Sequence, residues 1–185
     1  LFSLKKYEES IVCYDKALEI KPNNLESLFN ISMALRHQEK YEESIVYLNK
    51  VITIDPKDMD ALNDKGHLLS ILKKHEEAIA CLNKALEIKP NHIRSWHNMS
   101  FILKNQEKHE EAIACLNKAL EIDPNNSQIL NSKSWYLCEL ERYEEALLLS
   151  EIAITTKNPH HECIHTKGFI LLKLKQYQDA IKWFD

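Results

Sequence analysis

Three histidines and a cysteine lie close together near the end of the chain, at His160, His161, Cys163 and His165. Imidazole nitrogens and thiolates are ligands that zinc prefers, and His161 and His165 are four residues apart, which places them on one face of a helix. Cys163 would point to another side of that helix, and no fourth ligand follows at the spacing of a zinc motif. We therefore expect no metal and no cofactor in this chain.

Paired glutamates are a second group that could do chemistry, as general acid and base. They recur along the chain as Glu8 and Glu9, Glu42 and Glu43, Glu76 and Glu77, Glu110 and Glu111, and Glu144 and Glu145. An active site is normally unique, whereas these pairs return at a fixed spacing, which is typical of solvated helix starts. No Ser/His/Asp or Cys/His set stands out either. The sequence therefore predicts that this chain is not an enzyme.

The five cysteines do not form a disulfide pattern. Cys13, Cys81 and Cys115 occupy equivalent positions of a repeat, and equivalent atoms of stacked helix pairs lie about 10 Å apart, beyond the roughly 7 Å that a disulfide allows between Cα atoms. We expect these three to be small buried side chains. An odd number of scattered cysteines favours a reducing, intracellular compartment such as the cytoplasm.

Composition excludes several classes of function. The 185 residues are 44% apolar and 28% charged, as in a folded globular chain. Two glycines are too few for a Gly-rich phosphate loop, and a net charge of −4 gives no general attraction to a phosphate backbone. No apolar run approaches the roughly 20 residues of a membrane span. We expect no nucleic-acid partner and no membrane partner.

The sequence repeats itself every 34 residues, as from Tyr7 to Tyr41. Tyrosine or histidine recurs at Tyr7, Tyr41, His75, His109, Tyr143 and Tyr177, and proline recurs at Pro22, Pro56, Pro90 and Pro124. The segment HEEAIACLNKALEIKPN from His75 returns from His109, with Asp123 in place of Lys89 as its one difference. This near-identity indicates an internal duplication.

Each repeat holds two amphipathic stretches. In the second stretch, apolar residues such as Ala78, Leu82 and Ala85 recur at spacings of three and four, which predicts a helix with one buried face. Acidic pairs begin this helix, as the helix dipole favours, and a proline-containing turn follows it. The first stretch, for example Ile93 to Lys104, predicts another helix. The chain is therefore expected to be all-α.

This pattern resembles the tetratricopeptide repeat family along essentially the whole chain. The resemblance lies in the 34-residue period, the proline turn and the small residues of both helices, which in the first helix are Ser32, Gly66, Ser100, Ser134 and Gly168. It implies a right-handed superhelical solenoid of antiparallel helix pairs. The chain departs from the family between the two helices, where the usual glycine is replaced by Glu39, Lys73, Glu107, Glu141 and Lys175.

The period also predicts the domain organisation. We expect one array over residues 1–185, with a partial repeat at 1–24, repeats at 25–58, 59–92, 93–126 and 127–160, and a partial repeat at 161–185. A solenoid needs polar caps at its ends, and both ends here fall inside a repeat. The sequence is therefore expected to be a segment of a longer chain.

The resemblance further implies that the first helices line a concave face, whose residues form three rows. The first row is Met33, His67, Phe101, Trp135 and Phe169; the second is Phe29, Asn63, His97, Asn131 and His165; the third is Asn30, Asp64, Asn98, Ser132 and Thr166. Together they predict an aromatic groove flanked by amide and hydroxyl groups that could bond a peptide backbone. Two interpretations stay open: the aromatic residues bind a partner, or they pack against a neighbouring helix or domain of the same chain.

The favoured function is a non-catalytic scaffold or adaptor that binds an extended peptide or helix of another protein along this face. One alternative is a targeting arm of a larger protein, as in proteins that resemble the O-linked N-acetylglucosamine transferases. A second is RNA binding, as in the related pentatricopeptide repeats, but those run at 35 residues and are typically basic. The carboxylate clamp of chaperone-binding members is not matched, because Phe29 and Met33 occupy the region where it needs polar side chains.

Overall fold

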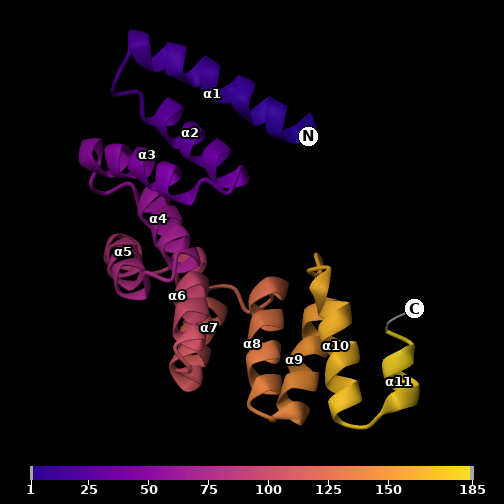
Figure 1. Cartoon of the computed structure of the whole chain (residues 1–185). Coiled ribbons are helices and arrows are strands. Elements are labelled where there is room, and N and C mark those ends of the chain that lie inside the picture. Colours follow the sequence, from indigo (N-terminus) through magenta and orange to yellow (C-terminus); the bar gives the residue numbers. More distant parts are fainter. Residues whose placement is uncertain (1, 184–185) are drawn as a thin grey trace. The chain divides into compact units, whose positions relative to one another are not determined.

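The computed structural model describes residues 2–183, and within them the side chains of residues 6–183. This part of the chain folds into eleven helices and contains no strand (Figure 1), which confirms the predicted all-α fold. The helices are α1 (Phe2–Ile20), α2 (Leu25–His37), α3 (Tyr41–Ile54), α4 (Met59–Ile71), α5 (His75–Ile88), α6 (Ile93–Asn105), α7 (His109–Ile122), α8 (Ser127–Glu139), α9 (Tyr143–Thr155), α10 (Glu162–Lys173) and α11 (Tyr177–Ile181).

The helices group into two compact units, which we call the N-terminal unit (Leu1–Pro90) and the C-terminal unit (Asn91–Asp185). Within each unit every helix packs against its neighbours in the sequence, as α2 against α3 and α8 against α9. In the C-terminal unit α10 also contacts α8, two helices earlier. This is the packing of stacked helix pairs; the extension of one array across both units stays a prediction.

Three of the five first helices, α2, α4 and α8, begin at a capping side chain. Asn24, Asp58 and Asn126 each accept a hydrogen bond from the backbone N–H three residues later, at 2.9, 2.9 and 3.2 Å. Such caps satisfy one of the N–H groups that a helix start leaves without a partner. His92 occupies the equivalent position before α6 and makes no such bond; its Nδ1 instead lies 2.7 Å from the Ser95 hydroxyl.

The first helix of each pair ends in a left-handed residue. The positions with φ near +60° are Glu39 (61°), Lys73 (59°), Glu107 (62°), Glu141 (60°) and Lys175 (60°). The following residue bonds back to a leucine carbonyl five residues earlier, as Lys108 N–H does to Leu103 O at 2.9 Å. This is the Schellman ending, whose left-handed residue is usually glycine. The five positions are those where the chain departs from the family pattern.

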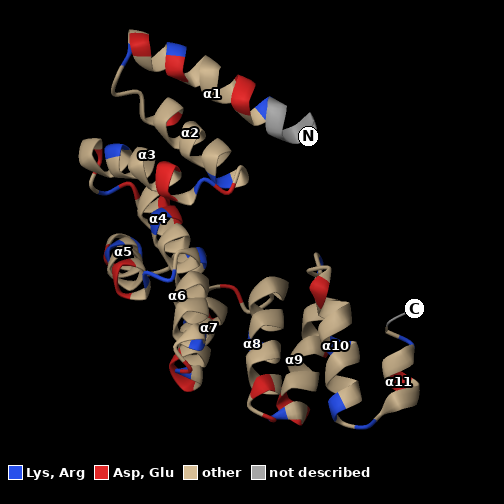
Figure 2. Ribbon diagram, in the orientation of Figure 1, with Lys and Arg blue, Asp and Glu red and all other residues tan. Residues whose placement is uncertain are grey.

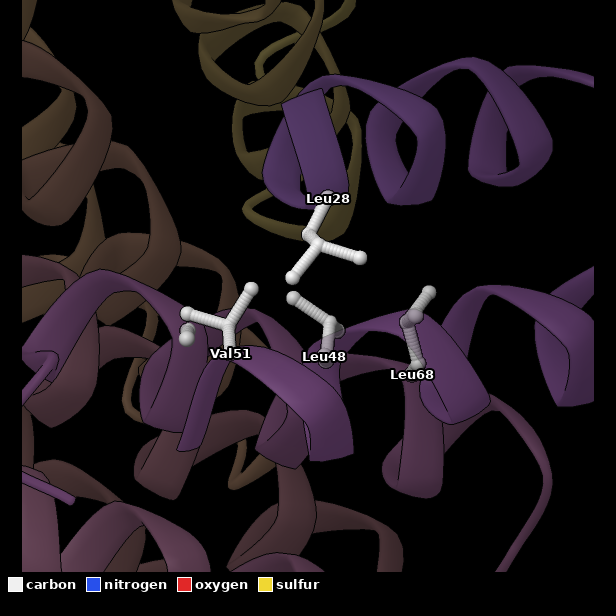
Figure 3. Packing of buried hydrophobic residues seen from close by; sticks show 5 residues of the cluster. Leu28, Leu48, Val51 and Leu68 are labelled. Carbon is white, nitrogen blue, oxygen red and sulfur yellow. The ribbon is translucent and has the colours of Figure 1, made fainter. Parts of the chain in front are cut away.

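The core of the N-terminal unit lies between α2, α3 and α4. Leu28 of α2 meets Leu48 and Val51 of α3, with Leu68 of α4 beside them (Figure 3). All four side chains are at least 98% buried. Burial of a leucine or valine of this kind stabilises the fold by about 1.5–3 kcal/mol, so the recurring apolar positions account for the pairing of these helices.

Small residues let the paired helices approach closely. A Cβ added to Gly66 of α4 would lie 2.8 Å from Leu82 Cγ of α5, so this position holds no larger side chain without movement. In the preceding pair the small residue of the first helix is Ser32 of α2. The hydroxyl of Ser44 on α3 donates to Ser32 O at 2.7 Å, so these two helices also lie close together. The small-residue pattern in the sequence therefore marks the contacts between the two helices of a pair.

Charged side chains of the C-terminal unit gather at the turns that join α6 to α7 and α8 to α9, and most of α8 carries none (Figure 2). Among residues 2–183, none of the helices combines the length and the apolar character that crossing a bilayer requires.

Candidate binding groove of the C-terminal unit

An open groove of about 630 Å³ runs over the first helices of three successive pairs, α6, α8 and α10. Its lining combines aromatic, histidine, amide and hydroxyl side chains. These are His97 and Phe101 of α6, Asn131, Ser132, Trp135 and Tyr136 of α8, and Glu162, His165, Thr166 and Phe169 of α10.

The aromatic side of the groove is formed by residues one repeat apart. Phe101, Trp135 and Phe169 follow the small residues Ser100, Ser134 and Gly168, which are buried against the second helices. The helical turn therefore places the aromatic residues on a different face from the buried one. Phe101 is 45% exposed and Trp135 is 36% exposed. The Trp135 and Phe169 rings pack together, with centroids 5.2 Å apart and planes tilted by 32°.

Polar contacts fix the tryptophan. Trp135 Nε1 donates to Glu139 Oε1 at 3.0 Å, and the same oxygen lies 3.0 Å from Lys104 Nζ of α6. At the other end of the aromatic side, Lys173 Nζ lies 5.2 Å from the centre of the Phe169 ring. The aromatic surface is thus held by groups from all three helices, and its indole N–H is already used.

The polar side of the groove is also cross-linked between helices. The Ser132 hydroxyl donates to Gln128 O at 3.0 Å, and His97 Nε2 lies 2.8 Å from the oxygen of the Ser132 hydroxyl. This contact joins α6 to α8 across the groove. Tyr136 is 5% exposed and hydrogen-bonds to Ser100, and burial is the main cause that raises the pKa of its phenol.

Asn131 differs from its neighbours because part of its amide is unsatisfied. The residue is 7% exposed, and its Oδ1 is buried with no hydrogen-bond partner among the described residues. This oxygen is one of several buried side-chain atoms of the described residues that have no protein partner, and the others lie outside the groove. Glu162 on α10 supplies a second acceptor, with His160 Nδ1 at 3.8 Å from its Oε2.

Six of the twelve binding residues predicted from sequence line this groove. They are His97, Phe101, Asn131, Trp135, His165 and Phe169. Asn98, also on α6, is half-buried and is not part of the lining. Tyr136 and Glu162 line the groove although they lie outside the predicted rows. Tyr136 occupies the same repeat position as the buried Ile102 and Ile170, so the sequence pattern predicts a core residue there and not a groove residue.

The other five predicted residues belong to the N-terminal unit. Phe29 packs against the core cluster around Leu48, and Asn63 is fully buried with its Nδ2 3.2 Å from Asp64 Oδ1. Asn30, Met33 and His67 are half-buried. Their role in binding stays a prediction.

The histidine and cysteine cluster is divided between two environments. Cys163 is fully buried beside Leu130 and Ala153, and its Sγ lies 3.7 Å from Ser127 O. His165, by contrast, lines the groove. Among the described residues, no three His, Cys, Asp or Glu side chains are placed to hold a metal ion.

The expectation of three buried cysteines holds for two of them. Cys81 and Cys115 are buried, and burial, followed by the nearby Glu111 carboxylate, raises the pKa of the Cys115 thiol to about 11. The prediction is wrong for Cys13, which is exposed. The face of α1 that carries Cys13 is not covered by the described helices that contact α1, whereas the equivalent faces of α5 and α7, which carry Cys81 and Cys115, are buried.

Helix pairs that repeat every 34 residues, with an open groove over the first helices of the C-terminal unit, define a helical repeat protein. A family model described as tetratricopeptide repeat matches residues 58–125. A second model, described as anaphase-promoting complex, cyclosome, subunit 3, matches residues 3–85 and 105–185. The chain belongs to the tetratricopeptide repeat family.

Solved structures share this fold at low sequence identity. PilW, described as a widely conserved type IV pilus biogenesis factor, is 16% identical with a TM-score of 0.85, over 97% of this chain and 83% of that one. Pseudomonas aeruginosa PilF is 18% identical with a TM-score of 0.81, over 97% and 82%. YrrB, described as a TPR protein with an unusual peptide-binding site, is 17% identical with a TM-score of 0.64, over 92% and 88%. No curated protein matches the sequence.

Proposed function

We propose that this chain is a non-catalytic interaction scaffold that binds an extended peptide or a helix of another protein in the groove over α6, α8 and α10. The observation that carries the proposal is that Phe101 and Trp135 are exposed in this groove, whose lining also includes buried polar side chains. Aromatic anchors surrounded by fixed hydrogen-bonding groups are the usual composition of a protein-recognition site.

The energetics favour such a role. The lining residues stand on helices that already pack against one another, so binding would order few additional groups. An aromatic anchor buried by a partner is typically worth about 2 kcal/mol or more, which is a thirtyfold change in affinity. Two such anchors together would change the affinity by about a thousandfold.

The charge of the groove supports a protein partner over a nucleic acid. Among the described lining residues there is no lysine or arginine, and Glu162 carries a negative charge. Nucleic-acid sites need several cations to replace the counterions of the phosphates. The same lack of cations disfavours a carboxylate clamp of the kind that binds chaperone tails.

The test compares capture of partners by wild-type protein with capture by Trp135→Ala and Phe169→Ala. Leu148→Ala is the matched control, because Leu148 is 60% exposed on α9 and outside the groove. We expect the groove variants to lose partners that the wild type and the control retain, and the dissociation constant of a purified partner to rise about thirtyfold per anchor. If both groove variants keep their affinity while their melting temperature falls, the rings only pack within the chain and the proposal is wrong.

A further inference from the structure

The charges around the groove balance one another. Lys104 Nζ of α6 lies 3.0 Å from Glu139 Oε1 of α8. Lys173 Nζ of α10 lies 5.2 Å from the centre of the Phe169 ring, and Glu162 is the one carboxylate among the described lining residues. Two cations thus accompany two carboxylates, and the groove carries no excess charge that would select an ionic occupant. A charged side chain that entered it would lose hydration without gaining a counter-charge.

Polar groups that join the helices under the groove are also paired within the chain. The indole Nε1 of Trp135 donates to Glu139 Oε1 at 3.0 Å, and His97 Nε2 lies 2.8 Å from the Ser132 hydroxyl oxygen. A polar occupant gains a hydrogen bond from these groups only if one of the existing contacts breaks. An apolar occupant leaves both contacts intact, so the groove favours an uncharged and apolar side chain.

The aromatic side favours a ring over an aliphatic side chain. Phe101 is 45% exposed and Trp135 is 36% exposed, so both offer ring surface to an occupant. Trp135 already packs on Phe169, with centroids 5.2 Å apart and planes tilted by 32°. Tilted and offset aromatic pairs gain free energy beyond the burial of their area, which an aliphatic group does not. A ring of the partner would extend this packing toward Phe101.

Glu139 fixes the indole that such a ring would meet. One of its carboxylate oxygens accepts from Trp135 Nε1 and also pairs with Lys104 Nζ, each at 3.0 Å. The carboxylate therefore ties the indole of α8 to a side chain of α6. Because the indole is held before a partner arrives, binding loses less side-chain entropy.

We propose that the groove anchors an uncharged aromatic side chain of the partner protein, packed on Phe101 and on the paired rings of Trp135 and Phe169. Glu139 is the positioning residue that holds the indole for this contact. This inference rests on the proposed function and specifies which side chain of the partner the groove recognises. Charged side chains should bind less well, whatever their sign.

The direct test uses capped peptides Ac-Ser-Gly-X-Gly-Ser-amide, with X as phenylalanine, cyclohexylalanine, leucine, arginine or glutamate, titrated into the full chain. The indole N–H signal of Trp135 is followed by NMR and assigned with Trp135→Phe. We expect the phenylalanine peptide to bind about tenfold more tightly than the arginine and glutamate peptides, and about threefold more tightly than the cyclohexylalanine peptide, which keeps the shape and loses the aromatic ring. Equal or tighter binding of any of these three, or no shift with phenylalanine, would overturn the inference.

Two pairs of variants test the contact surface. Phe101→Leu keeps an apolar side chain and should weaken the phenylalanine peptide about threefold, whereas Phe101→Ala should weaken it about tenfold. Glu139→Leu releases the indole and should weaken it severalfold and move the indole N–H signal. Glu139→Gln keeps an oxygen acceptor and should restore most of that affinity. Leu148→Ala, outside the groove, should leave the affinities of all five peptides unchanged. If Glu139→Leu binds as the wild type does, Glu139 has no positioning role and that part of the inference is wrong.

Salt and concentration identify other occupants. Because the proposed anchor uses no ionic contact, raising sodium chloride from about 0.05 M to about 0.5 M should weaken the phenylalanine peptide by less than about twofold. A larger loss would mean that charges hold the occupant, and the inference would be wrong. If the Trp135 signal moves with protein concentration alone, and Trp135→Ala abolishes that self-association, a second copy of this chain fills the groove and the inference is wrong.

The outcomes separate the two proposals. If Trp135→Ala abolishes binding of the protein partner while the peptides show no preference for phenylalanine, the inference fails and the proposed function stands. If Trp135→Ala leaves the protein partner bound, both fail.

Discussion

Replacing Glu107 by glycine should stabilise the protein, although it removes a side chain. Glu107 ends α6 with φ at 62°, a conformation in which the Cβ of an L-residue crowds the following carbonyl oxygen. That crowding costs about 1–2 kcal/mol, whereas glycine adopts the conformation freely and loses about 0.5–1 kcal/mol through its larger chain entropy in the unfolded state. The expected net gain is about 0.5–1 kcal/mol.

The assay is thermal and urea unfolding of the full chain. A gain of this size raises the melting temperature by about 1–4 °C if the whole chain unfolds together, and by about 2–8 °C if the C-terminal unit unfolds alone. Glycine at the four equivalent positions should give similar gains. These nearly add, because the sites lie in different repeats.

Two controls separate the backbone effect from the effect of charge. Glu107→Ala removes the carboxylate and keeps the Cβ, so it should give less than half of the gain. Lys108→Gly changes the next residue, whose φ of −86° is comfortable for any side chain, and it should destabilise by about 0.5–1 kcal/mol. If alanine stabilises as much as glycine at Glu107, or if glycine lowers the melting temperature, the explanation from backbone conformation is refuted.

Two substitutions and one labelling experiment test separate features of the fold. Gly66→Ala should destabilise by about 1–2 kcal/mol in urea unfolding, because the new Cβ would lie 2.8 Å from the buried Leu82 Cγ; an unchanged midpoint would show that the helices can separate freely. Asn126→Ala removes the cap of α8 and should lower the unfolding free energy by about 1 kcal/mol, whereas an unaltered value would mean that the cap contributes nothing. In thiol labelling at pH 8, exposed Cys13 should react well before Cys115, because Cys115 is buried and its pKa, raised to about 11, leaves almost no thiolate; comparable rates would contradict its burial.

The sequence specifies the helix pairs well because each repeat carries its own signals. The same 14 residues form α5 and α7, and both helices begin at the histidine and end at the isoleucine. Asn24, Asp58 and Asn126 cap their helices at equivalent positions, as local chemistry predicts. Local signals decide such features, so no knowledge of distant contacts is needed.

The groove is harder to predict because contacts between repeats shape it. His97 bonds Ser132, and Lys104 pairs with Glu139, in both cases 35 residues along the chain and not 34. The extra residue reflects the offset with which one first helix packs on the next. Burial of Asn131 and the position of Glu162 depend on that offset, which the amphipathic pattern of a single helix does not contain.

Site-specific photocrosslinking tests most directly whether the groove of the C-terminal unit is a binding surface for another protein. A benzoylphenylalanine is placed at Phe101 in the groove and, as the control, at Leu148 on α9, and cells that express the full protein are irradiated. We expect a covalent adduct to a distinct protein from position 101, lost when Trp135 is also replaced by alanine, and none from position 148. Adducts confined to the same chain, or equal adducts from both positions, would contradict the assignment of this groove as the binding surface.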